Sequence, residues 1–312
     1  MLNYYRLLLS ALVAALMMTA NVSWGAGVAG VDCASSINVT TEVTNAGGWY
    51  DCDSSPDTMV IKFYEIGLCT SKPTYLDTSS CEFLYKDEVG KEAVFSNTTV
   101  NKLVEEAYFV EGDYKYAVLL ISNTIGFKKT VTFDNTVYSM NGTSGLKCWT
   151  NGNERLDAPN AHSEAMFDCG SPNGASAQKS NITYKGLWSD AFNINNAIGP
   201  GNYPYTDNML NQVASSDAIF DIYLLNAGGG LATVSTALNN YGSPYPTGTA
   251  DKIWGVQTFT NSKKIDSSTT IMDTAFAITD SLILGFGGYC LNGGKCLEKG
   301  IISKLEFRVT TD

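Results

Sequence analysis

The sequence is poor in arginine and histidine. Only three of its 20 basic residues are arginine, and His162 is the single histidine in 312 residues. Proteins that recognise nucleic acids or phosphates usually present a clustered basic face and arginine side chains that bind in a bidentate manner. This chain has no such cluster, and its net charge is −11. The composition therefore excludes nucleic acid as a partner.

Sequence motifs of enzymes are also absent. The chain contains no Gly-x-Ser-x-Gly and no HExxH, and the His162-x-Glu164 pair is not followed by PCxxC. The glycine-rich stretches 226–230 and 285–288 lack the P-loop lysine and the Rossmann spacing. A nucleophilic mechanism would have to use His162, which lies in a predicted loop. We therefore expect no enzymatic activity, no cofactor and no metal, although a glycosidase with paired carboxylates needs no sequence motif.

Long apolar runs occur only at the N-terminus. Arg6 is the only charged residue among residues 1–26, an apolar run extends from Leu7 to Ala20, and small residues surround Ala26. This is the layout of a secretory signal, and about 14 apolar residues are too few for a comfortable membrane span. We predict that residues 1–26 are a signal peptide and that the mature chain has no membrane span. It would be secreted, extracellular or at the cell surface, with the periplasm as an alternative.

Eight cysteines are present, and export predicts that they form disulfides. Loop closure and hairpin geometry favour neighbours in the sequence as partners. The predicted pairs are Cys33–Cys52, Cys69–Cys81, Cys148–Cys169 and Cys290–Cys296. The last pair has the Cys-x-Asn-Gly-Gly-x-Cys spacing of EGF-like modules, but no further cysteine follows it, so a tight Asn-Gly-Gly turn is the better interpretation. We expect all four pairs to be structural.

Most of the chain has the periodicity of β-strands. The central segment, Tyr114 to Phe133, is apolar in its first half and alternates in its second half, where Lys129 shares a face with Phe127 and Phe133. Asn123 and Gly126 are typical turn residues, so this segment is predicted to be a hairpin. A second hairpin is predicted from Thr58–Leu68 and 82–85, with Cys69–Cys81 joining its strands.

Three further elements are expected. Ser36–Val43 is predicted to be the first strand, Asn101–Ala107 a short helix and Lys304–Thr310 a closing strand. Many short strands separated by turn signals are typical of an all-β sandwich or jelly roll. A chain of this length favours two β-rich halves, and we place an N-terminal β-sandwich domain at 27–143 and a C-terminal β-rich domain at 144–312.

Two groups of residues are candidates for binding. Asp51, Asp53 and Asp57 form an acidic cluster, and calcium prefers oxygen ligands, but the glycine and terminal glutamate of an EF-hand are missing. An ordinary acidic loop is the simpler interpretation. Aromatic residues in predicted loops, which can stack on a sugar or a protein partner, are Trp49, Tyr50, Tyr203 and Tyr205.

These observations predict an exported, extracellular or cell-surface protein with a structural or interaction role. Its partner would be another protein or a second copy of itself, because sheet edges can pair with other chains. The segments suited to strand exchange are Gly27–Val43, as an N-terminal arm, and Lys304–Thr310. The alternative is a module that binds or cleaves carbohydrate through exposed aromatic residues and an Asp/Glu pair.

Overall fold

The computed structural model describes a defined part of the chain. The described residues are 31–46, 48–96, 110–157, 162–171, 183–186, 205–206, 219–231, 251–267, 269, 272–288, 290, 294–302 and 306–311. The predicted signal peptide at 1–26, the predicted helix at Asn101–Ala107 and the aromatic residue Tyr203 lie outside them.

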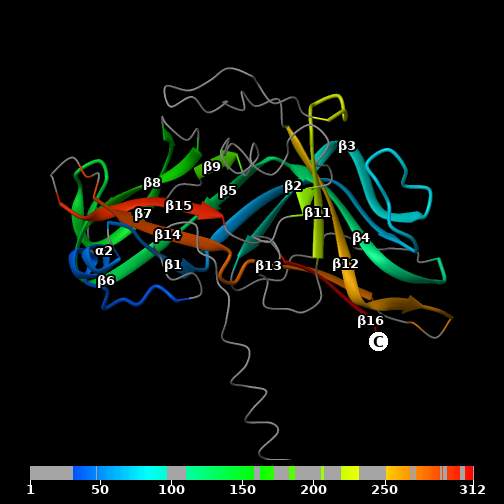
Figure 1. The fold of residues 1–312 in the computed structure, drawn as a ribbon, viewed down its shortest axis with the longest axis horizontal. Helices are drawn as coiled ribbons and strands as arrows, with labels where there is room; N and C mark the ends of the chain where they lie inside the picture. The colour runs from blue at the N-terminus through cyan, green and yellow to red at the C-terminus, as the bar shows by residue number, and fades with distance from the viewer. Residues whose placement is uncertain are drawn as a thin grey trace, which may run out of the picture.

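The described chain consists almost entirely of strands, which confirms the all-β prediction (Figure 1). The elements are α2 (Val39–Asn45), β1 (Tyr50–Ser54), β2 (Thr58–Cys69), β3 (Cys81–Ser96), β4 (Gly112–Ser122), β5 (Thr124–Lys128), β6 (Thr130–Ser139), β7 (Ser144–Asp157), β8 (His162–Gly170), β9 (Thr183–Gly186), β10 (Tyr205–Thr206), β11 (Ile219–Leu225), β12 (Lys252–Ile265), β13 (Met272–Ala277), β14 (Leu282–Gly287), β15 (Cys296–Ile302) and β16 (Glu306–Thr311).

The strands form two large sheets and one small one. The six-stranded sheet has the order β1-β14-β15-β6-β7-β8, and β15 also pairs with β8. The eight-stranded sheet has the order β10-β11-β12-β4-β2-β5-β9, with β3 on the other side of β2. In Figure 1 the six-stranded sheet occupies the left of the molecule and most of the eight-stranded sheet the right. The third sheet contains only β13 and β16.

Both large sheets contain strands from each side of the boundary that the sequence suggests at residues 143 and 144. Strand β1 pairs with β14, and β4 pairs with β12. Neither half therefore has a large sheet of its own, and the division into 27–143 and 144–312 stays a prediction.

The segment from Tyr114 to Phe133 is not a hairpin, and that prediction is wrong. Strands β4 and β5 do not pair with each other; both pair antiparallel with β2, β4 along Phe63–Cys69 and β5 along Thr58–Val60. Only Asn123 separates them. They therefore form one long strand with an irregularity, because pairing of both halves with β2 outweighs the local turn preference of Asn123 and Gly126. After Lys129 the same path continues as β6 in the other sheet.

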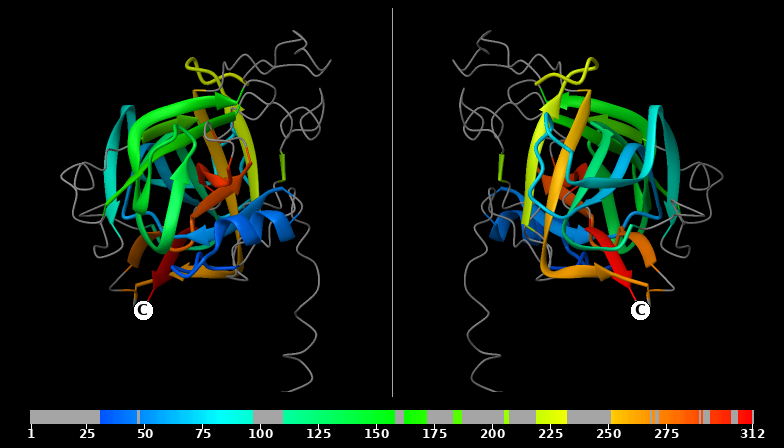
Figure 2. Two further views of the ribbon diagram at one scale, coloured as in Figure 1. Left: turned by 90° about the vertical axis from the view of Figure 1, so that its left-hand side faces the viewer. Right: turned by 90° about the vertical axis from the view of Figure 1, so that its right-hand side faces the viewer.

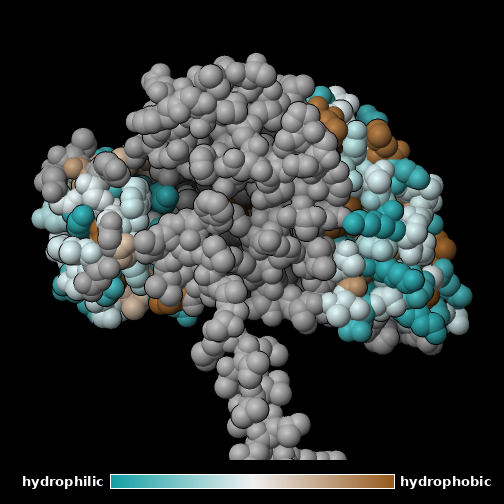
Figure 3. Space-filling model, in the orientation of Figure 1, coloured by the Kyte–Doolittle hydropathy of each residue, from teal (hydrophilic) through white to brown (hydrophobic). Residues whose placement is uncertain are grey.

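The hairpin of β2 and β3 is confirmed, and its two strands pair from Thr58↔Ser96 to Cys69↔Cys81. A bulge interrupts β3, where the Asp87 carboxylate accepts hydrogen bonds from the backbone N–H groups of Val89 and Gly90. Most side chains of β3 near this bulge are charged and exposed. Figure 3 shows hydrophilic residues over the right-hand end of the molecule, where β3 and β4 lie in Figure 1.

The predicted first strand at Ser36–Val43 is wrong, because most of it belongs to helix α2. The Asn38 side chain caps the helix by accepting a hydrogen bond from the Thr41 backbone N–H over 3.1 Å. Val39 and Val43 lie four residues apart and are both buried, as expected for one face of a helix. The β-branched residues of this segment resemble a strand in the sequence, but the cap and the burial of one face favour the helix.

Helix α2 packs on a core that belongs mainly to the six-stranded sheet. This cluster contains Ile37, Val39, Val43, Cys52, Phe127, Phe133, Val137, Cys148, Phe167, Cys169, Leu282, Leu284, Phe286 and Leu297. Phe127 comes from β5 of the eight-stranded sheet, so the core reaches across the point where the β4–β5–β6 path changes sheets. A second cluster, on the eight-stranded sheet, contains Cys69, Val118, Tyr223, Leu225, Trp254 and Val256.

Candidate functional site

Four disulfides join the same cysteine pairs that proximity in the sequence favours. Cys69 and Cys81 are directly opposite each other in β2 and β3, and Cys148 and Cys169 are opposite in β7 and β8. Their Cα atoms are 4.0 Å apart in both cases. Each of these disulfides joins two adjacent strands of its own sheet. Cys69–Cys81 lies in the eight-stranded sheet and Cys148–Cys169 in the six-stranded sheet.

The disulfide between Cys33 and Cys52 attaches the segment before α2 to β1. The Cys33 backbone N–H donates to the Asp53 oxygen over 2.9 Å, and the Asp53 N–H donates to the Val31 oxygen over 2.8 Å. Residues 31–33 therefore cover the outer edge of β1. The prediction of a free N-terminal arm from Gly27 to Val43 is wrong for residues 31–43, because they dock on the protein's own sheet and core.

The three aspartates of the predicted acidic loop do not share one loop. Asp51 and Asp53 lie in β1, while Asp57 comes just before β2. Asp57 accepts a hydrogen bond from the Thr130 backbone N–H over 2.7 Å. Asp51 faces Gly285 across the strand pair. These carboxylates are not among the residues that the described part of the chain brings together as possible metal ligands.

Lys129 lies where the β4–β5–β6 path changes sheets, and its side chain is only 14% exposed. Its ammonium group donates to the Ser55 backbone oxygen over 2.8 Å and lies 3.9 Å from an oxygen of Asp57. Burial lowers the pKa of Lys129, and the nearby Asp57 carboxylate opposes this effect only in part. The sequence places Lys129 on the same face as Phe127 and Phe133, and the burial of all three agrees with that assignment.

The aromatic residues expected in loops have different environments. Tyr50 is part of β1 and packs on Phe286, with ring centroids 6.2 Å apart. Trp49 is half-buried, and the Lys299 ammonium group lies 5.1 Å from its ring centroid. Tyr205 begins the short strand β10. Trp49 and Tyr50 are both half-buried, and Tyr50 packs against the core.

His162 begins strand β8, where it pairs with Asp157 of β7. The prediction that His162 lies in a loop is therefore wrong. The expectation that His162 is not catalytic stays a prediction.

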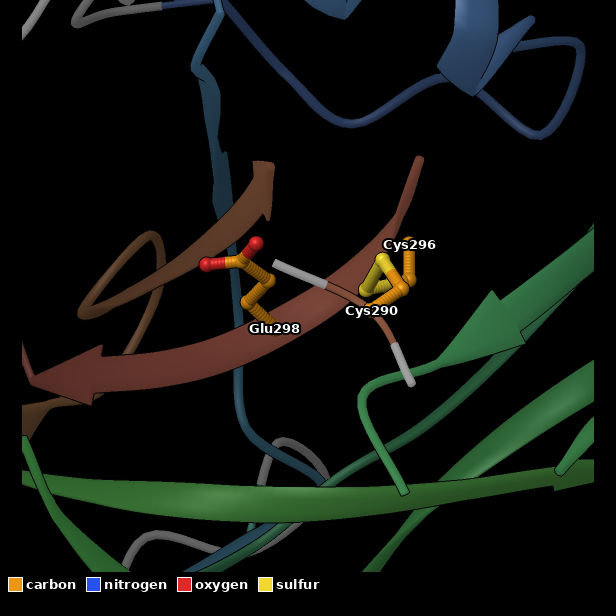
Figure 4. Close-up of side chains that lie close together, drawn as sticks. All are labelled: Cys290, Cys296 and Glu298. Atoms are coloured by element: carbon orange, nitrogen blue, oxygen red, sulfur yellow. A yellow bond between two sulfur atoms is a disulfide. The ribbon is translucent and has the colours of Figure 1, made fainter. Parts of the chain in front are cut away.

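One group of potential ligands was not recognised in the sequence. The sulfurs of Cys290 and Cys296 and a carboxylate oxygen of Glu298 all lie within 4.8 Å of one another (Figure 4). All three residues are buried, and they come from the hairpin of β14 and β15. Glu298 follows Cys296 by two residues, and in the sequence only this Cys-x-Glu spacing could have pointed to the group. In the structure the two cysteines form a disulfide, so their sulfurs are not free to bind a metal.

No family model, curated protein or solved structure matches this chain. The described residues contain no helix with the length and the apolar character that a membrane span requires. The function must therefore be inferred from the arrangement of the strands and side chains.

The third sheet differs from the other two in having only two strands. Strands β13 and β16 pair antiparallel from Met272↔Thr311 to Ala277↔Glu306. Within the described residues, neither strand pairs with a large sheet. In both views of Figure 2 this ribbon lies below the large sheets, and β16 leads to the C-terminus. Each of the two strands therefore has one edge without a ladder partner in the described part of the chain.

Proposed function

We propose that this protein is an exported, extracellular or cell-surface structural and interaction protein that assembles by exchange of strand β16. In the assembly, β16 of one copy pairs with β13 of the next. The observation that supports this proposal is the isolated ribbon, because β16 pairs with β13 and with no other strand of the described chain.

A ribbon of two strands is marginally stable on its own in water. Exchange replaces the pairing within one chain by the identical pairing between two chains, so it requires no new complementary surface. Only residues 303–305 separate the end of β15 from the start of β16. A connection this short favours exchange when it hinders the strand from folding back onto its own chain.

Two of the other strand edges, those of β1 and β3, are less suited to assembly. Residues 31–33 cover the outer edge of β1. The edge of β3 carries the bulge at Asp87–Gly90 and many charged side chains, both of which oppose edge-to-edge pairing. The ribbon is therefore the edge that we assign to self-assembly.

Cysteine cross-linking between copies tests the exchange. Thr274 and Val309 are directly opposite in the ribbon, and opposite residues of antiparallel strands are close enough for a disulfide. We would mix equal amounts of a Thr274→Cys variant and a Val309→Cys variant under mild oxidation. We expect a covalent dimer in which peptide mapping finds position 274 of one chain linked to position 309 of another.

Two controls accompany this mixture. Glu306 pairs with Ala277 rather than with Thr274, so a mixture of Thr274→Cys and Glu306→Cys should give little cross-linking. The double variant Thr274→Cys/Val309→Cys, oxidised at low concentration before it can assemble, should close the link within one chain and then stay monomeric at high concentration. If the first mixture gives no dimer and the wild type sediments as a monomer at high concentration, self-assembly through this ribbon is wrong.

Carbohydrate binding or cleavage is the alternative, and among the aromatic side chains that the structure describes Trp49 is the one that supports it. This side chain is partly exposed, but Lys299 already lies over its ring, and Tyr50 packs on the core. Binding of a soluble polysaccharide that disappears in a Trp49→Ala variant with unchanged circular dichroism would favour this alternative over the assembly role.

A further inference from the structure

We propose that reduction of the Cys290–Cys296 disulfide creates a metal site with Glu298 as the third ligand. The two sulfurs and the Glu298 carboxylate are already within 4.8 Å of one another. A tetrahedral zinc ion holds sulfur ligands about 3.8 Å apart and a sulfur and an oxygen about 3.6 Å apart, as follows from its bond lengths of about 2.3 and 2.1 Å. Binding therefore requires the two sulfurs to separate while the carboxylate stays near its present position.

The backbone around the disulfide is compatible with this change. The Cα atoms of Cys290 and Cys296 are 6.0 Å apart, the longest such distance among the four disulfides. The Cys290 sulfur lies 3.7 Å from the Gly287 oxygen, at the end of β14. Rotation of the two cysteine side chains can separate the sulfurs without moving β14 or β15.

Glu298 distinguishes this disulfide from an ordinary staple. The residue is only 3% exposed, and glutamate is rarely buried to this extent unless it is paired. Gly287 provides the room for it, because a Cβ atom at that position would lie 2.6 Å from the Glu298 Cδ. A structural disulfide needs neither the buried carboxylate nor the glycine beside it. Two thiolates and one carboxylate form a donor set that suits zinc or another borderline divalent cation, with the fourth position left for water.

The redox step is a two-electron exchange. A dithiol reductant donates two electrons and two protons to the Cys290–Cys296 disulfide and becomes a cyclic disulfide, which leaves two cysteine thiols. The divalent cation then displaces both thiol protons and binds the thiolates. The metal site thus exists only in the reduced form of this pair.

Cobalt binding by the full chain tests the proposal, because thiolate-bound Co²⁺ has a charge-transfer band. The wild type would be reduced with a dithiol, alkylation and peptide mapping would identify the reduced pairs, and the protein would be titrated with Co²⁺. We expect one Co²⁺ per chain with a thiolate charge-transfer band after reduction of Cys290–Cys296 and none before it. Zn²⁺ should displace the Co²⁺ and abolish the band.

Two variants make the test specific. Cys290→Ser/Cys296→Ser keeps the other three disulfides, and under the same reduction it should lose the band. Glu298→Gln should keep both thiols but weaken Co²⁺ binding at least about tenfold, since even outer-shell partners of metal ligands contribute that much. Equal binding by oxidised and reduced wild type, or by any variant and the wild type, would overturn the proposal. Loss of the β-sheet circular dichroism in Cys290→Ser/Cys296→Ser would also overturn it, because the site requires the fold to survive without this disulfide.

Discussion

The ammonium group of Lys129 donates a hydrogen bond to the Ser55 backbone oxygen over 2.8 Å. This contact joins the point where the β4–β5–β6 path changes sheets to the residue that follows β1. Lys129 is therefore a cation held in a mostly buried position between the two large sheets.

The Lys129→Met variant should change the pH dependence of stability. Burial lowers the pKa of Lys129 below its ordinary 10.5. At pH values between this lowered pKa and 10.5, the folded protein therefore binds fewer protons than the unfolded chain. The free energy of unfolding of the wild type should therefore rise with pH through this window, and this rise should be absent in the variant. Urea unfolding of both proteins at a series of pH values measures the difference.

Measurements for this prediction should stay below pH 10. The pKa values of Tyr50, Tyr85 and Tyr114 are raised from 10.0, mainly by burial. Above pH 10 the unfolded chain loses these protons first, so the tyrosines destabilise the folded protein as the pH rises. Parallel stability curves for Lys129→Met and wild type below pH 10 would contradict the prediction.

Val118→Asp should prevent folding. Val118 is fully buried in the central part of β4 and packs with Cys69 and Trp254, and an unpaired charge placed there cannot be solvated. Lys115→Asp, at an exposed position of the same strand, should change the free energy of unfolding by less than about 1 kcal/mol. Circular dichroism and urea unfolding compare the two.

Leu120 is only partly buried, so Leu120→Asp should be less damaging than Val118→Asp. The reverse order would mean that the burial of β4 is wrongly assigned.

Gly145→Ala should destabilise the contact between β7 and β8. A Cβ atom at Gly145 would collide with the backbone of Gly170, which a side-chain rotation cannot relieve. Overpacking of this kind typically costs about 1–3 kcal/mol, and we expect the upper part of that range in urea unfolding. The matched control is Gly294→Ala, where a Cβ atom meets nothing within 4 Å. Similar stability of both variants would contradict the close approach of Gly145 and Gly170.

Asn38→Ala should lower the stability by about 1 kcal/mol, the usual effect of losing a helix cap. The Asn38 side chain accepts the Thr41 backbone N–H, and Asn38→Asp, which preserves this acceptor, should restore most of the loss. Thr40→Ala, at an exposed position of the same helix, serves as the control for a general effect on α2. Equal unfolding free energies of Asn38→Ala and Asn38→Asp would show that the cap does not contribute.

The sequence predicted best those features that depend on neighbours along the chain. The alternation from Thr58 to Leu68 predicts β2, and proximity predicts the cysteine pairs, because hairpins bring residues close in sequence into contact. The buried face of Phe127, Lys129 and Phe133 also follows from simple alternation.

Features that depend on distant partners could not be predicted in this way. Asn123 and Gly126 favour a turn locally, yet β4 and β5 continue along β2 because the whole sheet contributes more than one turn. Helix α2 had a cap signal in Asn38, but its β-branched residues favoured a strand. The closeness of Glu298 to Cys290 depends on the pairing of β14 with β15, and the Cys296-x-Glu298 spacing alone does not indicate it.

The pairing of β1 with β14 has a consequence for how the protein folds. Cys52 lies opposite Leu284, so 232 residues separate two positions of one ladder. Because such distant contacts gain their free energy only after a large loop has closed, folding rates fall as the sequence separation of contacts grows. A growing chain cannot complete β1 until residues 282–286 have been synthesised. The six-stranded sheet therefore cannot form strand by strand in the order of synthesis, because β1 has to wait for β14.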